Sequence, residues 1–136
     1  MNAERLAGQL LADEGLKLKP YRCPAGKLTI GVGRNLDDRG ITREEAMLLL
    51  KNDIADFWGR LCAAAPWVLA APAPVQEALV NMAFNLGLAG LLGFTKTLAL
   101  LKDRRYAEAA EAMLRSRWAG QVGARARRLA EAIRAA

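Results

Sequence analysis

The sequence contains no histidine, and this absence narrows the chemistry open to it. Histidine is the commonest general base near neutral pH, the commonest metal ligand and the usual partner of serine or cysteine nucleophiles. The chain also lacks the glycine-rich dinucleotide fingerprint, the P-loop and the Cys-x-x-Cys motif. Acid–base chemistry near neutral pH must therefore use carboxylates, thiols or water, and we expect neither a cofactor nor a metal.

Cysteine is scarce as well. Cys23 and Cys62 are too few for a disulfide framework, and the simplest interpretation is two free thiols in a cytoplasmic protein. A bridge between them is unsupported because nothing in the sequence fixes their separation. No run of roughly 18 apolar residues occurs, and residues 1–15 lack the apolar stretch of a signal peptide. We therefore expect no stable membrane insertion.

The length of 136 residues suits one domain, and a hydrophobic content of 53% suits a chain with a buried core. The net charge is +6, and most of it lies in residues 104–136, which hold eight arginines against three glutamates. A basic surface of this kind favours an anionic partner, such as nucleic acid, a membrane surface or a bacterial wall polymer. The structural alternative is a solubilising face on an Ala/Arg-rich helix.

Hydrophobic periodicity predicts a helix over residues 3–13 that ends at Gly15, with Glu14 at its end. Strict alternation over residues 28–33, after the turn at 24–26, predicts a β-hairpin of residues 21–23 and 27–32. Residues 36–40 are expected to form a loop. Thr42 and Glu45 then form a capping box that starts a long helix reaching about residue 62.

The remainder of the sequence predicts a helical bundle. Prolines bracket a break over residues 66–74, with one helical turn at 67–70, and the expected helices are 75–86, 95–102, 106–116 and about 124–135. The expected fold class is a mainly helical α+β protein. Its single domain, 1–136, is a hairpin lobe (about 15–41) on a helical lobe (about 1–14 and 42–136), and a cleft between lobes favours ligand binding.

Three residues of the first lobe could carry chemistry. Glu14, Cys23 and Thr29 follow one another at spacings of nine and six residues. A carboxylic acid at the end of an apolar helix is a candidate proton donor, because burial raises its pKa. A hairpin facing it could present the second group that glycoside hydrolysis needs. The structural alternatives are a solvated helix-end glutamate and a threonine present for β propensity.

These residues belong to a wider pattern. Residues 13–35, DEGLKLKPYRCPAGKLTIGVGRN, resemble the phage-type lysozymes (glycoside hydrolase family 24), in which a glutamate, an aspartate or cysteine, a threonine and Ile-Gly-x-Gly keep this spacing. Further similar segments follow in order and extend the resemblance over almost the whole chain: ITREEAMLLLKNDI, NMAFNLGLAGLLGFTKTL and RSRWAGQVGARARRLAE.

The resemblance implies a lysozyme-like fold and roles for individual residues. It implies that Glu14 protonates the glycosidic oxygen between N-acetylmuramic acid and N-acetylglucosamine in bacterial peptidoglycan. Cys23 stands where many members carry a catalytic aspartate, and Thr29 would help to hold the attacking water. Further residues would bind saccharide (Gly33, Asn35, Phe84 and Asn85) or support the catalytic helix end (Asp13, Arg125 and Arg128), with Arg125 near Glu14 and Arg128 near Asp13.

The sequence departs from the family in two places. Arg34 replaces the usual histidine after Ile-Gly-x-Gly, so any ion pair built on that histidine is changed. The segment between Gly33 and Ile41 is short, which predicts a β lobe close to a bare hairpin. At the second catalytic position, the thiol of Cys23 could act as a thiolate, could only position water, or could leave the site impaired.

The resemblance therefore implies an endolysin muramidase, acting as a monomer, that stays in the host cytoplasm until it reaches the cell wall. Three alternatives remain. A lytic transglycosylase would need only Glu14, because the sugar's own 6-hydroxyl replaces water. A non-catalytic wall-binding protein would need no acid, and a nucleic-acid-binding protein would use the C-terminal arginines. We do not expect nucleic acid, because no recognition motif accompanies those arginines.

Overall fold

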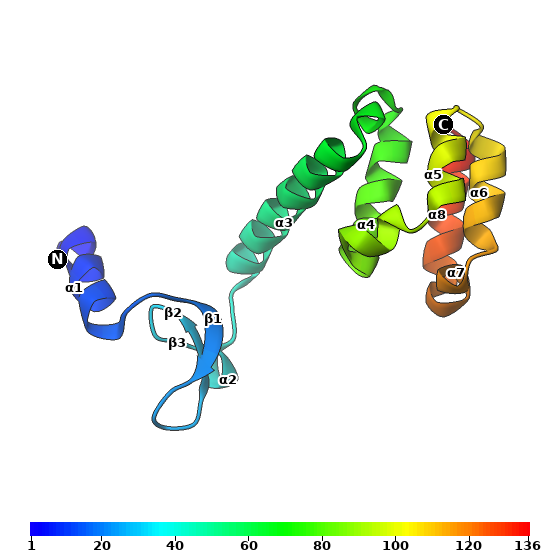
Figure 1. Cartoon of the computed structure of the whole chain (residues 1–136). Coiled ribbons are helices and arrows are strands. Elements are labelled where there is room, and N and C mark those ends of the chain that lie inside the picture. The colour runs from blue at the N-terminus through cyan, green and yellow to red at the C-terminus, as the bar shows by residue number, and fades with distance from the viewer. The chain divides into compact units, whose positions relative to one another are not determined.

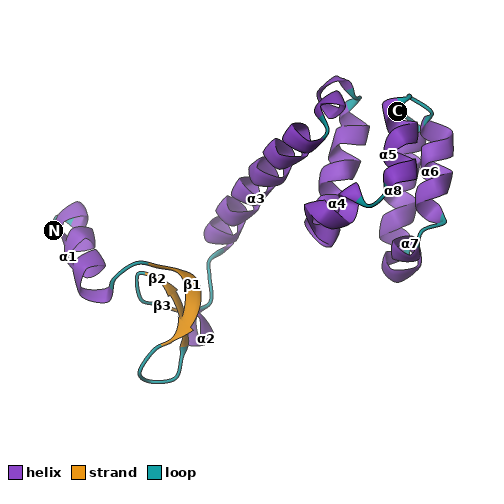
Figure 2. Ribbon diagram, viewed as in Figure 1, coloured by secondary structure: helices purple, strands orange, loops and turns teal.

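The structure, a computed structural model, describes all of residues 1–136 and divides into two compact units, Met1–Leu49 and Leu50–Ala136. Every strand lies in the first unit, and the second is wholly helical (Figures 1 and 2). This combination confirms the mainly helical α+β fold class. The division of one domain into a hairpin lobe and a helical lobe at the predicted boundaries stays a prediction.

The first unit begins with helix α1 (Ala3–Glu14). The Asn2 side chain caps it by accepting a hydrogen bond from the backbone N–H of Arg5 at 2.9 Å. The helix ends at Gly15, whose φ of 75° is in the region that favours glycine and whose N–H donates to the Leu11 carbonyl. The predicted helix over residues 3–13 is thus confirmed, one residue longer.

A three-stranded antiparallel sheet follows, in the order β1 (Lys17–Arg22), β2 (Leu28–Gly31) and β3 (Arg34–Asn35). The turn between β1 and β2 closes through a 2.7 Å hydrogen bond from the Gly26 N–H to the Cys23 carbonyl. The predicted hairpin is confirmed. The short strand β3 was not predicted, because two residues are too few to show an alternating pattern.

The loop predicted over residues 36–40 is wrong. This segment contains helix α2 (Leu36–Arg39), and Asn35 caps it by accepting from the Asp38 N–H at 3.0 Å. Aspartates in its first turn complement the partial positive charge at the start of a helix. A helix of one turn has too few residues for hydrophobic periodicity, so only the Asn cap could have revealed it.

Helix α3 (Arg43–Ala64) starts in the first unit and continues into the second. Its predicted capping box is confirmed in both directions. The Glu45 N–H donates to the Thr42 hydroxyl at 3.1 Å, and the Thr42 N–H donates to the Glu45 carboxylate at 2.9 Å. The start of α3 is therefore fixed by local hydrogen bonds.

The second unit contains six further elements. They are the 3₁₀ helix η1 (Pro66–Ala70), α4 (Ala73–Leu92), α5 (Thr95–Lys102), α6 (Tyr106–Leu114), α7 (Arg117–Val122) and α8 (Ala124–Arg134). The predicted helices and the single turn near 67–70 are confirmed in position, although α4 continues past Leu86 across Gly87, whose φ of 76° interrupts it, and α6 ends at Leu114. The separate helix α7 was missed, although the Ser116 hydroxyl caps it by accepting from the Ala119 N–H at 3.1 Å.

Helix α4 supplies much of the core of this unit. By length and composition alone it could cross a membrane, with a mean hydropathy of 1.3, and 33% of that stretch is buried in the core. Burying one large aliphatic side chain contributes about 1.5–3 kcal/mol. The large side chains that are fully buried in this core are Leu61, Val68, Val75, Leu79, Met82, Leu91, Leu101, Met113 and Ile133.

Candidate active site

Glu14 lies at the C-terminal end of α1, and its side chain reaches back over the glycine loop between β2 and β3. A Cβ atom on Gly33 would stand 3.1 Å from Glu14 Oε2 and 3.2 Å from its carboxyl carbon. Gly33 also has a φ of 69°, which disfavours any other residue. Glycine is therefore needed here twice, for the backbone conformation and for the close approach of the carboxylate.

The burial expected for Glu14 is not found in the first unit. Glu14 is exposed, and α1 has no buried residue. The sequence suggested burial because Leu6, Leu10 and Leu11 form an apolar stripe, yet these side chains are 39–46% exposed. Within this unit the position of the carboxylate is defined by Gly15, where the helix ends, and by Gly33, which it contacts.

Cys23 lies at the start of the hairpin turn, and backbone hydrogen bonds fix its position. Its N–H donates to the Lys27 carbonyl at 3.0 Å, and its carbonyl accepts from the Gly26 N–H. The thiol is free and half-buried. The second predicted catalytic group is thus carried on backbone whose geometry the turn defines.

Thr29 lies two residues beyond the turn, on β2, and is 4% exposed. Its hydroxyl donates to the Lys27 carbonyl at 2.9 Å, which leaves its oxygen lone pairs available to accept a hydrogen bond from water. Cys23 and Thr29 are therefore both tied to Lys27. The structure brings these two predicted residues together at one end of the hairpin.

The strand register adds a residue that the sequence did not suggest. Tyr21 and Asn35 both stand directly opposite Thr29, on its two neighbouring strands. Opposed residues in antiparallel strands share a face, so these three polar side chains lie side by side across the sheet. Tyr21 could have been found only by fixing the register of the hairpin.

The pKa of the Cys23 thiol is lower than that of an ordinary thiol. The main cause is a hydrogen bond from the backbone N–H of Lys27 to the sulfur, which partial burial opposes by favouring the neutral form. The Ala25 N–H lowers the pKa further, and so does the neighbouring Thr29 hydroxyl. The turn therefore stabilises a thiolate.

Helix α2 braces the hairpin next to its turn. Asp37 accepts a hydrogen bond from the Leu28 N–H at 2.7 Å and pairs with Arg22 at 3.3 Å. Asp38 pairs with Lys27 at 3.1 Å. Helix α2 thus holds Arg22 and Lys27, which flank the hairpin turn on its two sides. It thereby supports the positions of Cys23 and Thr29.

Asn35 is half-buried, and both ends of its amide already bond to Asp38. The oxygen accepts from the Asp38 N–H, and the nitrogen donates to the Asp38 carboxylate at 2.9 Å. The side chain therefore shapes α2 in this structure. Its predicted role in binding saccharide, like that of Gly33, stays a prediction.

Arg34, which replaces the histidine usual in the resembling family, has a new partner. Its guanidinium donates to Glu45 at 2.8 Å and to the Gly40 carbonyl at 3.2 Å. The Arg34 guanidinium and the Thr42 N–H together lower the pKa of Glu45 to about 2. A lowered carboxyl pKa gives stabilisation that is complete above the ordinary value of 4.5 and is lost as the pH falls toward 2.

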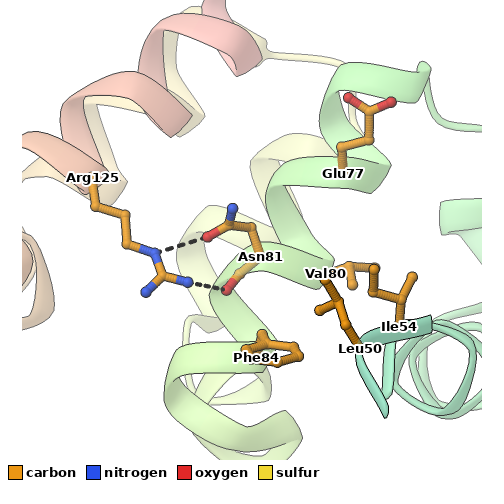
Figure 3. A pocket seen from close by; sticks show the side chains of 7 residues that line it. All are labelled: Leu50, Ile54, Glu77, Val80, Asn81, Phe84 and Arg125. Carbon is orange, nitrogen blue, oxygen red and sulfur yellow. Dashed lines mark hydrogen bonds between the residues drawn. The ribbon is translucent and has the colours of Figure 1, made fainter. Parts of the chain in front are cut away.

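The second unit carries the remaining predicted residues, and two of them line one pocket. Phe84 and Arg125 share a cavity of about 350 Å³ with Leu50, Ile54, Glu77, Val80 and Asn81 (Figure 3). Arg125 reaches across from α8 and donates to the Asn81 side chain at 2.9 Å and to its carbonyl at 3.2 Å. The predicted position of Arg125 near Glu14 stays a prediction.

Asn85 is held by an aromatic residue of α7. The Trp118 indole N–H donates to its side-chain oxygen at 2.8 Å, and Trp118 meets Phe94 edge-on with ring centroids 6.0 Å apart. Asn81 stands four residues before Asn85 on α4, a spacing that places both on one helix face. That spacing was the signal for Asn81 in the sequence. Asp13 and Arg128 are exposed, and their supporting roles stay predictions.

The acid at a helix end, the small sheet and the helical second unit define a mainly helical α+β protein of the lysozyme class. The model of the phage lysozyme family matches residues 12–131, and the chain belongs to this family of lysozyme-like cell-wall hydrolases. The family implies peptidoglycan as the substrate.

Named relatives agree with the family. Probable T4-type lysozyme 1 of Dictyostelium discoideum is 28% identical over an alignment 151 positions long, which covers 89% of this chain and 88% of the relative. An endolysin of Acyrthosiphon pisum secondary endosymbiont phage 1 is 34% identical over 93 residues, 65% of this chain and 60% of that protein. Pre-baseplate central spike protein Gp5 of Enterobacteria phage T4 is 29% identical over an alignment 152 positions long, which covers 91% of this chain but 26% of that protein.

Proposed function

We propose that the protein is a muramidase that hydrolyses the β-1,4 bond between N-acetylmuramic acid and N-acetylglucosamine, with Glu14 as the general acid. The contact of the Glu14 carboxylate with Gly33 is the main support, because it sets the acid beside the loop that joins β2, the strand of Thr29, to β3. In this proposal Glu14 donates its proton to the glycosidic oxygen as the bond to the leaving sugar breaks. The attacking water then meets the cationic sugar from the side of the hairpin.

Cys23 and Thr29 handle that water in our proposal. The Thr29 oxygen accepts one hydrogen bond from the water, and the Cys23 thiolate accepts its proton as the new C–O bond forms. An ordinary free thiol is only a few per cent ionised at pH 7. The lowered pKa of Cys23 raises that fraction, which favours the thiolate over a neutral thiol that only positions water.

The thiolate role predicts a particular dependence on pH. The ratio of wild-type activity to Cys23→Ser activity should rise with pH and level off as the thiol ionises. Its midpoint should lie below the ordinary thiol value of about 8.5. Taking the ratio removes every titration that the two proteins share. The assay is the release of reducing sugar ends from peptidoglycan between pH 5 and 9.

Cys62→Ser is the matched control for this experiment, because Cys62 is also a free, half-buried thiol but lies on α3 in the second unit. Its ratio to wild type should stay flat across the pH range. A flat ratio for Cys23→Ser, with activity retained at every pH, would show that the thiol has no role as a base.

Digestion of purified peptidoglycan followed by mass spectrometry tests the reaction itself. We expect fragments with reducing muramic ends, 18 Da heavier than the corresponding anhydro species because water is the nucleophile. Fragments with 1,6-anhydro ends would instead establish the lytic transglycosylase. The weaker second catalytic group makes that the main alternative, since it needs Glu14 alone. Absence of any cleavage would leave a non-catalytic protein that binds the wall or nucleic acid.

We further propose a lytic role, with the protein held in the cytoplasm of a bacterial host before it reaches the wall. The endolysin among the relatives supports this role. Expression in bacteria should leave cells intact until a separate agent permeabilises the inner membrane, and lysis should then follow within minutes. Lysis without such an agent would contradict the proposed cytoplasmic location.

A further inference from the structure

A second pocket in the helical unit combines aromatic rings with unpaired positive charge. It has a volume of about 260 Å³ and lies where η1, the end of α5 and the start of α6 meet. We call it the basic aromatic pocket and define it by Trp67, Ala71, Leu101, Lys102, Arg104 and Tyr106. None of these residues belongs to the active site proposed above.

The lining of this pocket separates into an apolar base and a charged edge. Leu101 is buried, Trp67 and Tyr106 are half-buried, and Lys102 and Arg104 are exposed. Neither cation forms an ion pair in the structure. The carboxylate between them in the sequence, Asp103, acts electrostatically on Arg105 and does not line the pocket.

The backbone of Arg104 supplies a separate observation. It is the only residue other than glycine with positive φ, at 61°. It follows the C-cap of α5, and the Arg105 N–H bonds back to the Leu100 carbonyl at 2.9 Å, a helix ending whose left-handed position is usually glycine. The turn alone would favour glycine, so the arginine is unexplained by the fold and places a guanidinium at the pocket edge.

The chemistry of this pocket matches an anionic saccharide. Aromatic side chains present flat apolar faces against which a sugar ring can pack, while cations at the edge pair with a carboxylate or phosphate on the same chain. The volume is slightly below the roughly 300–1,000 Å³ of sites for drug-sized ligands, which suits one sugar or polyol unit. Because the family acts on peptidoglycan, such units are abundant wherever the enzyme works.

We propose that the basic aromatic pocket is a second, non-catalytic binding site for an anionic unit of the bacterial wall, carried on a sugar or polyol. This inference rests on the proposed function, because it assumes that the protein works on peptidoglycan. The anion is either a stem-peptide carboxylate or a phosphate of a wall glycopolymer. Binding here keeps the enzyme on the insoluble wall and raises the effective concentration of its active site there.

The test compares two doubly substituted proteins of equal charge, both in a Glu14→Gln background so that the wall stays undigested. Lys102→Gln/Arg104→Gly removes the cations of the pocket, and glycine suits the left-handed turn, so folding is preserved. Lys96→Gln/Arg127→Gln is the control, because both side chains are exposed and neither makes a hydrogen bond or an ion pair. Co-sedimentation with insoluble peptidoglycan should weaken about tenfold in the first protein and less than twofold in the second. Equal weakening would overturn the proposal.

Treated wall preparations then identify the anion. Wall stripped of its phosphate polymers and wall with amidated carboxylates are each compared with untreated wall. Loss of the difference between the two variants in one preparation supports the proposal and names the source as phosphate or carboxylate. A difference that survives both treatments would mean that no wall anion pairs with these cations, and it would overturn the proposal.

The indole signal of Trp67 reports on the pocket directly. Titration of Glu14→Gln with a soluble muropeptide should shift this NMR signal, assigned with Trp67→Phe, and Lys102→Gln/Arg104→Gly should abolish the shift. Inorganic polyphosphate, an anion without a sugar, should not shift it. A shift of equal size with polyphosphate, or none with either the muropeptide or a soluble fragment of the phosphate glycopolymer, would contradict a saccharide site.

Activity separates this inference from the proposed function. With Glu14 intact, the Lys102→Gln/Arg104→Gly protein should digest insoluble wall several-fold more slowly than the Lys96→Gln/Arg127→Gln control, yet both should cleave short soluble glycan strands equally. An equal rate on insoluble wall would overturn the second site while leaving the muramidase in place. No cleavage of either substrate by wild type would instead overturn the proposed function. The co-sedimentation experiment would still test whether the basic aromatic pocket binds the wall, because it does not depend on cleavage.

Discussion

Glu14→Gln is expected to reduce the hydrolysis of peptidoglycan by roughly 10³-fold, within the range that a positioned general acid contributes. The amide keeps the size and shape of the side chain, and so keeps its contact with Gly33, but it has no proton to donate to a leaving alkoxide. The chain has no imidazole that could replace it. The measurement is kcat from the release of reducing ends, with circular dichroism to show an unchanged fold.

Glu4→Gln is the matched control, since Glu4 lies in the first turn of the same helix and is also exposed. It removes an equal charge and should leave kcat unchanged within a factor of two. A Glu14→Gln enzyme with near wild-type activity would end the assignment of Glu14 as the acid and, with it, the proposed mechanism.

Gly33→Ala should lower kcat, but by less than the roughly 10²-fold that misplacing a catalytic group by 1 Å costs, because the Glu14 carboxylate must shift by only a few tenths of an ångström. The new methyl group would meet Glu14 Oε2 at 3.1 Å, which is closer than ordinary van der Waals contact, so the carboxylate must move. Left-handed backbone also costs an alanine about 1–2 kcal/mol in folding free energy. Kinetics and chemical denaturation together separate the two effects.

Gly31→Ala isolates the backbone effect. Gly31 has nearly the same φ, 70°, and lies two residues earlier, but a Cβ there would meet nothing within 4 Å. Both variants should therefore lose similar stability, and only Gly33→Ala should lose catalysis. If both lost activity equally, the function of Gly33 would be limited to the turn, and its contact with the acid would carry no catalytic meaning.

The elements that were predicted well have strong local signals. Residues 3–14 carry an Asn cap at one end and a glycine at the other, and Thr42 with Glu45 marks the start of α3. The missed elements are short. β3 has two residues, α2 has four and α7 has six, so each is defined by a cap or a strand partner and not by a repeating pattern.

The candidate site was predicted only in part, because residue spacing is visible in the sequence but contacts between strands and helices are not. The spacing of Glu14, Cys23 and Thr29 was visible in the sequence, and the structure ties Cys23 and Thr29 to one residue, Lys27. Tyr21 was missed because it joins them only through strand register. The partner of Arg34, Glu45, was missed because the pair depends on how the sheet meets a helix eleven residues later.

The ion pair of Arg34 with Glu45 has a consequence for how the enzyme can be studied. Where a histidine stands at this position, the charge of the lobe changes across physiological pH; a guanidinium keeps its charge throughout that range. The carboxylate it holds titrates near pH 2, far outside the working range. With no imidazole in the chain, no histidine titration overlaps that of the Cys23 thiol, whose pKa is lowered by hydrogen bonds from the turn. In a Cys62→Ser protein, the ionisation of the Cys23 sulfur can therefore be followed in an active enzyme without any histidine titration beside it.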